Sequence, residues 1–486
     1  YIPDTVEILT TQKSTRGFII LSAGFSEESK EGAELEKKVV DTINKVHGTL
    51  IGPNCIGVLT PEYHGVFTMP IPKLEMKGCD FISGSGATAC FIMEAGIPKG
   101  LPFARVFSVG NSAQVGVEEI LKFMDETYDP EISSKVKLLY IENIDKPEML
   151  LEHARSLISK GCMIAAIKAG TSEAGSRAAS SHTGALASSD AAVEALFKKA
   201  GIVRCYGREE LISVASIFLQ KPLQGKNMAI ITHAGGPAVM LTDELSDHGI
   251  NIPTIEGEKA DELLEELYPG SSVSNPIDFL ATGTADQLGK IIDYTDAKFD
   301  NIDGMAVIFG TPGLFDIYDV YEVLDNKMKT CKKPIFPILP STLTAKNEIQ
   351  SFIDKGHIYF SDEVVFGNAL GKVLNTPFPT VKKDYSPVSD CKGIRNVIDN
   401  TDSGYISPEN VQMLLDCSEI PRISEFVVKK EDQAVEMANK AGYPVVMKVV
   451  GPIHKSDVGG VRLNINNESE ASENFREIMK IKNATG

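Results

Sequence analysis

One histidine lies in a segment whose other side chains are almost all small. Between Lys168 and Asp190 the chain is largely Gly, Ala, Ser and Thr, with His182 its only imidazole and Arg177 its only cation. A neutral imidazole is a good nucleophile near pH 7, because its unperturbed pKa is about 6.5, and its nitrogen can carry a phosphoryl group. A lone histidine more often packs or caps, so His182 needs partners to become a candidate phosphoryl acceptor.

Three other segments could supply those partners. Glu142 follows a predicted strand at its carboxyl end, where open α/β sheets bind ligands, and could orient the imidazole through its second nitrogen. Two strand–turn–helix transitions, 83–88 and 233–237, could hold the phosphate, because helix N-termini bind anions. Each glycine pair alone is more often just a tight turn. The residues at these two turns are Ser85 and Gly86, and Gly235 and Gly236.

The last hundred residues add two weaker candidates. Lys448 lies on a predicted strand whose pattern would bury it, as expected for a lysine that binds nucleotide phosphates. His454 opens a polar loop, His454–Gly460, that ends in two glycines. The residues alone favour an ordinary surface loop there.

Short runs of Ile, Val, Phe and Leu alternate with amphipathic stretches of helical length, which predicts repeated βα units and an α/β fold. At 100–200 residues per domain, about three or four domains are expected in 486 residues. Proline- and lysine-rich stretches at 221–226 and 377–387 predict linkers. The predicted strands are 17–21, 49–51, 80–82, 104–109, 136–141, 163–167, 228–232, 305–309, 335–339, 425–428 and 444–450.

The composition excludes some classes of partner. The chain has 48 Lys and Arg against 66 Asp and Glu, a net charge of −18, and no basic run interleaved with aromatics, so nucleic acid is not an expected partner. No apolar run of 18 residues predicts a membrane span. The eight cysteines are scattered without a CxxC pair, which favours a reducing, cytoplasmic location. Most should be buried, and the role of Cys55 stays open.

Together these motifs resemble the ADP-forming acetyl-CoA synthetases, relatives of succinyl-CoA synthetase. The most specific matches are Ser181–Leu186, Gly52–Cys55 with Gly57, Ser83–Gly86 and His454–Gly460, and the resemblance covers essentially the whole chain. It implies a multidomain α/β fold with four parts. These are a partial Rossmann-like CoA-binding domain (1–72), two flavodoxin-like CoA-ligase domains (73–220 and 226–376) and a partial ATP-grasp domain (388–486).

The resemblance also implies roles for the candidate residues. His182 would be phosphorylated and Glu142 would orient it, while His454 would relay the phosphoryl group to ADP. The phosphate would be held by Ser85, Gly86, Gly235 and Gly236, and the nucleotide by Lys448. CoA would contact Ser22, Ala23, Gly24, Phe25, Pro53, Asn54 and Cys55.

The expected ligands are acetate or acetyl-CoA, phosphate, CoA, ADP or ATP, and Mg, in a homodimer. The family carries a glycine-rich turn before the point matched by Tyr1, and its acidic Mg ligands beyond Gly486. We therefore expect the CoA and nucleotide sites to be incomplete within this chain.

Two other functions remain open. A succinyl-CoA synthetase-type ligase could act on another acid, although the fused domain order and His454 argue against it. A regulatory module that senses CoA and nucleotide, or acylates proteins, would be expected to lose the active histidine. Both His182 and Glu142 are present in the sequence.

Overall fold

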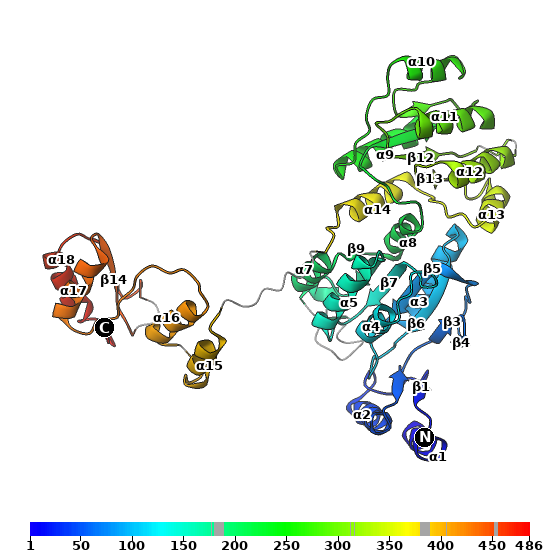
Figure 1. Cartoon of the computed structure of the whole chain (residues 1–486). Helices are drawn as coiled ribbons and strands as arrows, with labels where there is room; N and C mark the ends of the chain where they lie inside the picture. The colour runs from blue at the N-terminus through cyan, green and yellow to red at the C-terminus, as the bar shows by residue number, and fades with distance from the viewer. Residues whose placement is uncertain are drawn as a thin grey trace. The chain divides into compact units, whose positions relative to one another are not determined.

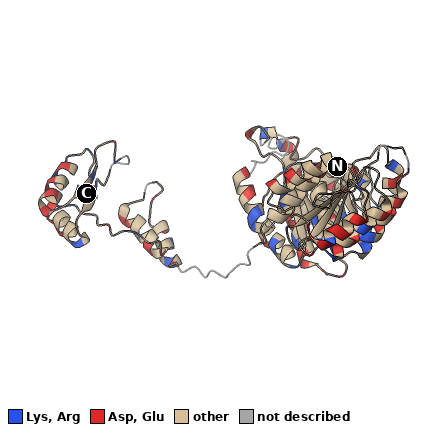
Figure 2. Cartoon of the chain, turned by 90° about the horizontal axis from the view of Figure 1, so that it is seen from above, with Lys and Arg blue, Asp and Glu red and all other residues tan. Residues whose placement is uncertain are grey.

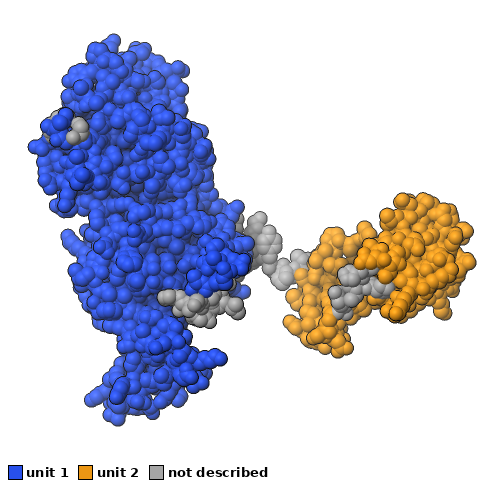
Figure 3. Space-filling view, turned by 180° about the vertical axis from the view of Figure 1, so that it is seen from behind, with its two compact units in different colours: residues 1–380 blue, residues 381–486 orange. Residues whose placement is uncertain are grey.

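The computed structural model describes residues 1–175, 177–178, 189–311, 313–314, 316–379, 389–404, 406–451 and 455–486. It divides into two compact units, residues 1–380 and 381–486, coloured separately in Figure 3. The predicted α/β class is confirmed in both units, and each is described by itself.

The first unit begins with a small two-stranded parallel sheet. Gly17 pairs with Thr49 in register, and the core beneath includes Val39, Ile43 and Leu50. The helix before the first strand was not predicted, because its apolar face is narrow. The elements are α1 (Ile2–Lys13), β1 (Gly17–Ile19), α2 (Lys30–Lys45) and β2 (Thr49–Ile51).

A seven-stranded sheet follows, in the order β4-β3-β6-β5-β7-β8-β9 (Figure 1). The strands β5 to β9 are parallel and have the 2-1-3-4-5 order of flavodoxin-like folds. Helices α3 and α8 cover one face, and α4, α5 and α7 cover the other. The strands are β3 (Gly57–Thr60), β4 (Tyr63–Val66), β5 (Leu74–Ser83), β6 (Phe103–Ser108), β7 (Val136–Ile141), β8 (Met163–Lys168) and β9 (Val203–Cys205). The helices are α3 (Gly86–Gly96), α4 (Val117–Glu126), α5 (Pro147–Ser159), α7 (Asp190–Ala200) and α8 (Arg208–Phe218).

A second parallel sheet repeats this topology with shorter strands. Its order is β11-β10-β12-β13, and Phe360 bridges to Ile338 where a fifth strand would lie. The strands are β10 (Met228–Thr232), β11 (Ile277–Asp278), β12 (Gly304–Ile308) and β13 (Ile335–Ile338). The helices are α9 (Gly235–Asp247), α10 (Glu258–Glu265), α11 (Ala285–Ala297), α12 (Tyr318–Thr330), α13 (Lys346–Asp354) and α14 (Glu363–Asn375).

The two flavodoxin-like sheets share one hydrophobic core. Ile212 of α8, Leu241 of α9 and Phe366 of α14 belong to the same buried cluster, which also includes residues of β5 and β10. The linker at 221–226 therefore joins two sheets without separating their cores. Before the expected boundary at residue 72, β3 pairs with both β4 and β6, so these two strands extend the larger sheet. Backbone pairing over 40 residues apart could not be read from local sequence.

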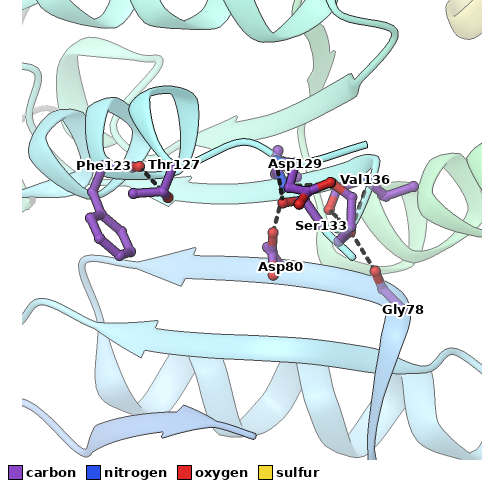
Figure 4. Close-up of polar contacts among 9 residues, drawn as sticks. Gly78, Asp80, Phe123, Thr127, Asp129, Ser133 and Val136 are labelled. Atoms are coloured by element: carbon purple, nitrogen blue, oxygen red, sulfur yellow. Dashed lines mark hydrogen bonds and ion pairs between the residues drawn. The ribbon is translucent and has the colours of Figure 1, made fainter. Parts of the chain in front are cut away.

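A buried ion pair ties β5 to β7 near the amino end of β7. Lys137 and Asp80 face each other in register, and their side chains are 1% and 0% exposed. Lys137 also donates to the Ser134 carbonyl, at 2.7 Å. Figure 4 shows Asp80 among the polar contacts at this end of the sheet. The pair lies away from the carboxyl ends of the strands, which indicates a structural role.

The described residues of the second unit form two helix pairs and one two-stranded antiparallel sheet. Its elements are α15 (Cys391–Asp399), α16 (Pro408–Cys417), α17 (Glu431–Ala441), β14 (Val445–Lys448), β15 (Val461–Ile465) and α18 (Glu468–Ile478). The strand predicted at 425–428 is wrong, because that segment pairs with no strand among the described residues. The predicted burial of Lys448 is also wrong. Along β14 half-buried and exposed positions alternate, and Lys448 is on the exposed side.

Charges of both signs lie along the helices around the sheets (Figure 2). Among the described residues, no helix combines the length and apolar character needed to cross a membrane.

Candidate functional site

A cavity of about 360 Å³ opens at the carboxyl ends of β5, β6 and β7. This edge, between the first and third strands in 2-1-3-4-5 order, is where open α/β sheets bind ligands. Five predicted site residues line the cavity together, and they come from segments nearly 90 residues apart in sequence: Asn54, Cys55, Ser85, Gly86 and Glu142.

The turn from β5 into α3 is built to present backbone N–H groups. Ser85 is the N-cap of α3, and its hydroxyl accepts a hydrogen bond from Thr88 N at 3.3 Å. Ser83 fixes the turn by donating its hydroxyl to the Ser85 carbonyl at 2.7 Å. A side chain at Gly86 would meet Ile56 Cγ2 at 2.5 Å, so only glycine fits. Because the first N–H groups of a helix have no partner within it, this turn can bind an anion.

Glu142 lies beside this turn. Gly84 donates its N–H to the Tyr140 carbonyl at 2.9 Å, and a Cβ on Gly84 would lie 4.0 Å from Glu142 Cγ. Glu142 is half-buried and lines the cavity. A carboxylate in this position can orient an imidazole that enters the cavity.

A second carboxylate, Glu118 of α4, holds the loop that begins with Glu142. One Glu118 oxygen accepts the N–H groups of Asp145 and Lys146, at 2.9 and 3.1 Å. Burial raises the pKa of the Glu118 carboxyl, despite these hydrogen bonds. Glu118 was not predicted, because its hydrogen-bond partners lie 27 and 28 residues away in the sequence.

Replacing Glu118 by alanine is expected to lower the enzyme's kcat/KM for its thioester substrate by about 10- to 100-fold. The loop that begins with Glu142 then loses its two hydrogen bonds to Glu118, and a displacement of about 1 Å in a positioned side chain has an effect of this size. Glu118→Gln should retain most activity, since an amide oxygen can accept the same two N–H groups. Glu126→Ala, at an exposed site on the same helix, is the control. Steady-state kinetics check this, and equal losses in Glu118→Gln and Glu118→Ala would contradict the positioning role.

The predicted CoA segments meet the cavity at Asn54 and Cys55. Asn54 N donates to the Ser22 carbonyl at 3.0 Å, which joins the two segments. Gly52 has φ +92°, and a Cβ there would meet the Ile20 carbonyl at 2.4 Å, so glycine is required. Cys55 is buried, and burial raises the pKa of its thiol, which argues against a thiolate nucleophile.

Asn111 connects these segments and was not predicted. Its carbonyl oxygen accepts from Asn54 Nδ2 at 3.2 Å, and its amide donates to Ser26 Oγ and Glu36 Oε2 at 3.2 and 2.9 Å. Asn111 also lines the cavity. Its position just after the β6 strand, as for Glu142 after β7, was the signal that could have found it.

The predicted CoA-contacting segment 22–25 does not itself line the cavity. Leu21 lines the cavity, whereas Phe25 is buried in the small core of α1 and α2. The N–H groups of Gly24 and Phe25 donate to Glu27 Oε1 at 2.6 and 3.2 Å, so a carboxylate already occupies them. Ser22 and Ala23 do not line the cavity, and neither does Pro53.

Gly235 and Gly236, the second predicted anion turn, are the first two residues of α9, which follows β10 of the second parallel sheet. Neither glycine lines this cavity. Its construction matches the first turn. Thr232 Oγ1 donates to the Ala234 carbonyl at 2.9 Å, as Ser83 does to Ser85. His233 Nε2 accepts from Gly310 N at 2.9 Å, and burial lowers the pKa of this imidazole.

Three predicted residues remain. Lys448 lines a cavity of about 660 Å³ in the second unit, together with Val427, Val446 and Lys455. His182 and His454 lie outside the described residues. Their assignment therefore depends on the sequence.

Comparison with known proteins gives the class of enzyme. A model of the succinyl-CoA ligase like flavodoxin domain matches residues 77–218, and an ATP-grasp domain model matches residues 398–485. A structure of dinucleotide-forming acetyl-CoA synthetase 1 from Ca. Korarchaeum cryptofilum, in complex with phosphate and ADP, has a TM-score of 0.69. It is 23% identical, covers 77% of this chain and 80% of that one, and so shows the fold.

Two curated relatives extend over almost the whole chain. ADP-forming acetate–CoA ligase from Methanocaldococcus jannaschii is 31% identical over 485 residues, covering 96% of this chain and 67% of the relative. ADP-forming 4-hydroxybutyrate–CoA ligase from Nitrosopumilus maritimus is 29% identical, covering 96% and 68%. The chain belongs to the family of ADP-forming acetate–CoA ligases, as its motifs predicted, and spans about two thirds of these relatives' length.

Proposed function

We propose that this chain belongs to an enzyme that catalyses the ADP-forming acyl-CoA ligase reaction, in which acyl-CoA, ADP and phosphate give a carboxylic acid, ATP and CoA. The observation that carries the proposal is the convergence, at one cavity, of the α3 anion turn, Glu142 and the Asn54–Cys55 segment. A phosphate, a carboxylate and a CoA-contacting segment are the parts that phosphorolysis of a thioester needs.

The reaction would proceed through two covalent carriers. A phosphate oxygen, held by the Ser85–Gly86 turn, attacks the thioester carbonyl, the C–S bond breaks, and CoA leaves as the thiol after taking a proton. His182 attacks the phosphorus of the acyl phosphate, releasing the carboxylate, while Glu142 accepts a hydrogen bond from the other ring nitrogen. The phosphoryl group then passes to His454 and on to ADP.

The remaining predicted residues take supporting roles. Gly235 and Gly236 would provide a second anion turn for the phosphohistidine, and Lys448 would bind a nucleotide phosphate. The segments containing Ser22 and Asn54 would contact CoA. Among the described residues no group of three or more His, Cys, Asp or Glu side chains is arranged for a metal ion, so no step is assigned through Mg. We also propose a cytoplasmic homodimer.

The test is phosphoenzyme formation. Incubation with acetyl-CoA and radiolabelled phosphate should leave label on the protein that is labile in acid and stable in base, as expected for phosphohistidine. Adding ADP should move that label into ATP. Label that survives acid and is lost in base would indicate a phosphoserine, and label lost in both would indicate an acyl phosphate; either result would contradict the proposal.

Ligation of a different acid is a second candidate, because the relatives' names include both acetate and 4-hydroxybutyrate. A panel of acyl-CoA thioesters in the same assay distinguishes the acids. A regulatory or protein-acylating role predicts no ATP formation with any thioester.

A further inference from the structure

One side of the cavity is apolar. Gly57 pairs with Val66 in the β3–β4 hairpin, and Ile56 directly precedes β3 while Phe67 directly follows β4. Both side chains line the cavity, with Ile56 6% exposed and Phe67 66% exposed. We call these two residues the apolar wall.

The apolar wall adjoins the anion turn. A Cβ on Gly86 would meet Ile56 Cγ2 at 2.5 Å, so Ile56 packs directly on the first residue of α3. Ile56 N is anchored by a hydrogen bond to Ser108 Oγ, at 3.2 Å. The Asn54–Asn111 pair, by contrast, gives the cavity a polar side. The apolar and polar sides therefore suit different parts of one ligand.

Phe67 is an exposed aromatic side chain that a bound ligand could cover. Met69 and Ile71, on the same segment, are also exposed, so three apolar side chains within five residues face solvent. Groups of exposed apolar side chains mark binding surfaces more often than isolated ones. The segment is fixed against α3, because Cys90 Sγ donates to Thr68 Oγ1 at 3.4 Å. Phe67 is thus held at the rim of the cavity.

We propose that Ile56 and Phe67 form the subsite for the acyl group of the substrate, with Phe67 limiting its size. This inference rests on the proposed function. When phosphate on the α3 turn attacks the thioester, the carbonyl carbon must lie beside Gly86. The acyl chain attached to that carbon then lies against the residue packed on Gly86, which is Ile56, and next to Phe67. The substrate class is a short, apolar carboxylic acid.

The experiment compares acetyl-CoA with phenylacetyl-CoA in the full chain and in Phe67→Ala. The ratio of kcat/KM for phenylacetyl-CoA to that for acetyl-CoA should rise about tenfold, since pocket volume discriminates by such factors. Phe67→Trp should lower the ratio. Phe91→Ala, an exposed phenylalanine on α3 that does not line the cavity, should leave it unchanged.

Three outcomes would overturn the subsite. An unchanged ratio in Phe67→Ala would remove Phe67 from acyl selection. An equal loss with both thioesters, with a raised KM for CoA in the reverse reaction, would assign Phe67 to CoA binding. An equal loss with a changed elution volume in size-exclusion chromatography would assign it to a subunit contact. If the unmodified chain turned over no acyl-CoA, the proposed function itself would fail.

Discussion

Replacing His182 by alanine is expected to abolish labelling by phosphate and acetyl-CoA, and with it ATP formation. The methyl side chain has no nucleophilic nitrogen, so the phosphoryl group of the acyl phosphate has no acceptor. The loss should be complete in the label and at least about 10³-fold in turnover, the scale seen when a covalent nucleophile is removed. His64→Ala, at an exposed histidine of β4, should label like the unmodified chain.

The second histidine should behave differently. His454→Ala should keep the label on the protein but fail to pass it to ADP, because the first transfer precedes the relay. Full labelling in His182→Ala would refute the first assignment, and normal ATP synthesis in His454→Ala would refute the second. The label and the ATP yield are read from the same reaction, so the two steps are separated directly.

Lys137→Met is expected to destabilise the first unit by about 3–5 kcal/mol, the range for breaking a buried ion pair on one side. The change leaves the Asp80 carboxylate fully buried without its cation, and Asp80 Oδ1 already lacks a hydrogen-bond partner. The double variant Asp80→Val/Lys137→Met should recover to within about 1 kcal/mol of the unmodified chain, because no charge is then buried. Urea unfolding measures the free energy of unfolding of the unmodified chain, of Lys137→Met and of the double variant. A double variant as unstable as the single one would indicate a packing defect rather than an unpaired charge.

The loss in free energy of unfolding caused by Lys137→Met should also depend on pH. Burial already raises the pKa of Asp80, and losing Lys137 removes the main charge that lowers it. A carboxyl whose folded pKa exceeds its unfolded value of about 3.9 stabilises the fold below that value and loses the contribution as pH rises. The destabilisation should therefore be smaller at pH 5 than at pH 8. A deficit that grew on acidification would contradict this.

Local pattern predicted most of the strands that position the site. The runs 49–51, 136–141 and 228–232 match β2, β7 and β10, because buried parallel strands are continuous apolar runs. Residues 426–428 are also apolar but gain no strand partner in the described part of the second unit. The pairing of β3 and β4 with the larger sheet also depends on contacts far apart in sequence.

The candidate site was predicted where one segment carries its own signal. The Ser83–Gly86 turn and Glu142 could be found because a strand, a glycine turn and a helix follow one another. Glu118 could not, because its role arises from hydrogen bonds to another segment. Asn111 follows β6 closely, so its position did carry a signal, although its hydrogen bond to Asn54 could not be predicted. Phe25 lies in the core of its own small sheet, and its contact with CoA stays a prediction.

The two flavodoxin-like sheets share one hydrophobic core, so they are not expected to move independently. Helices α8 and α14 pack together within it, so α3 and α9, and with them the two anion turns, keep a fixed spacing. In the proposed reaction, a group held first at one turn and then at the other would cross a constant gap, because neither half can move toward the other without exposing apolar surface to water. A rigid molecule with two anionic ends matched to that gap is therefore expected to inhibit the proposed reaction.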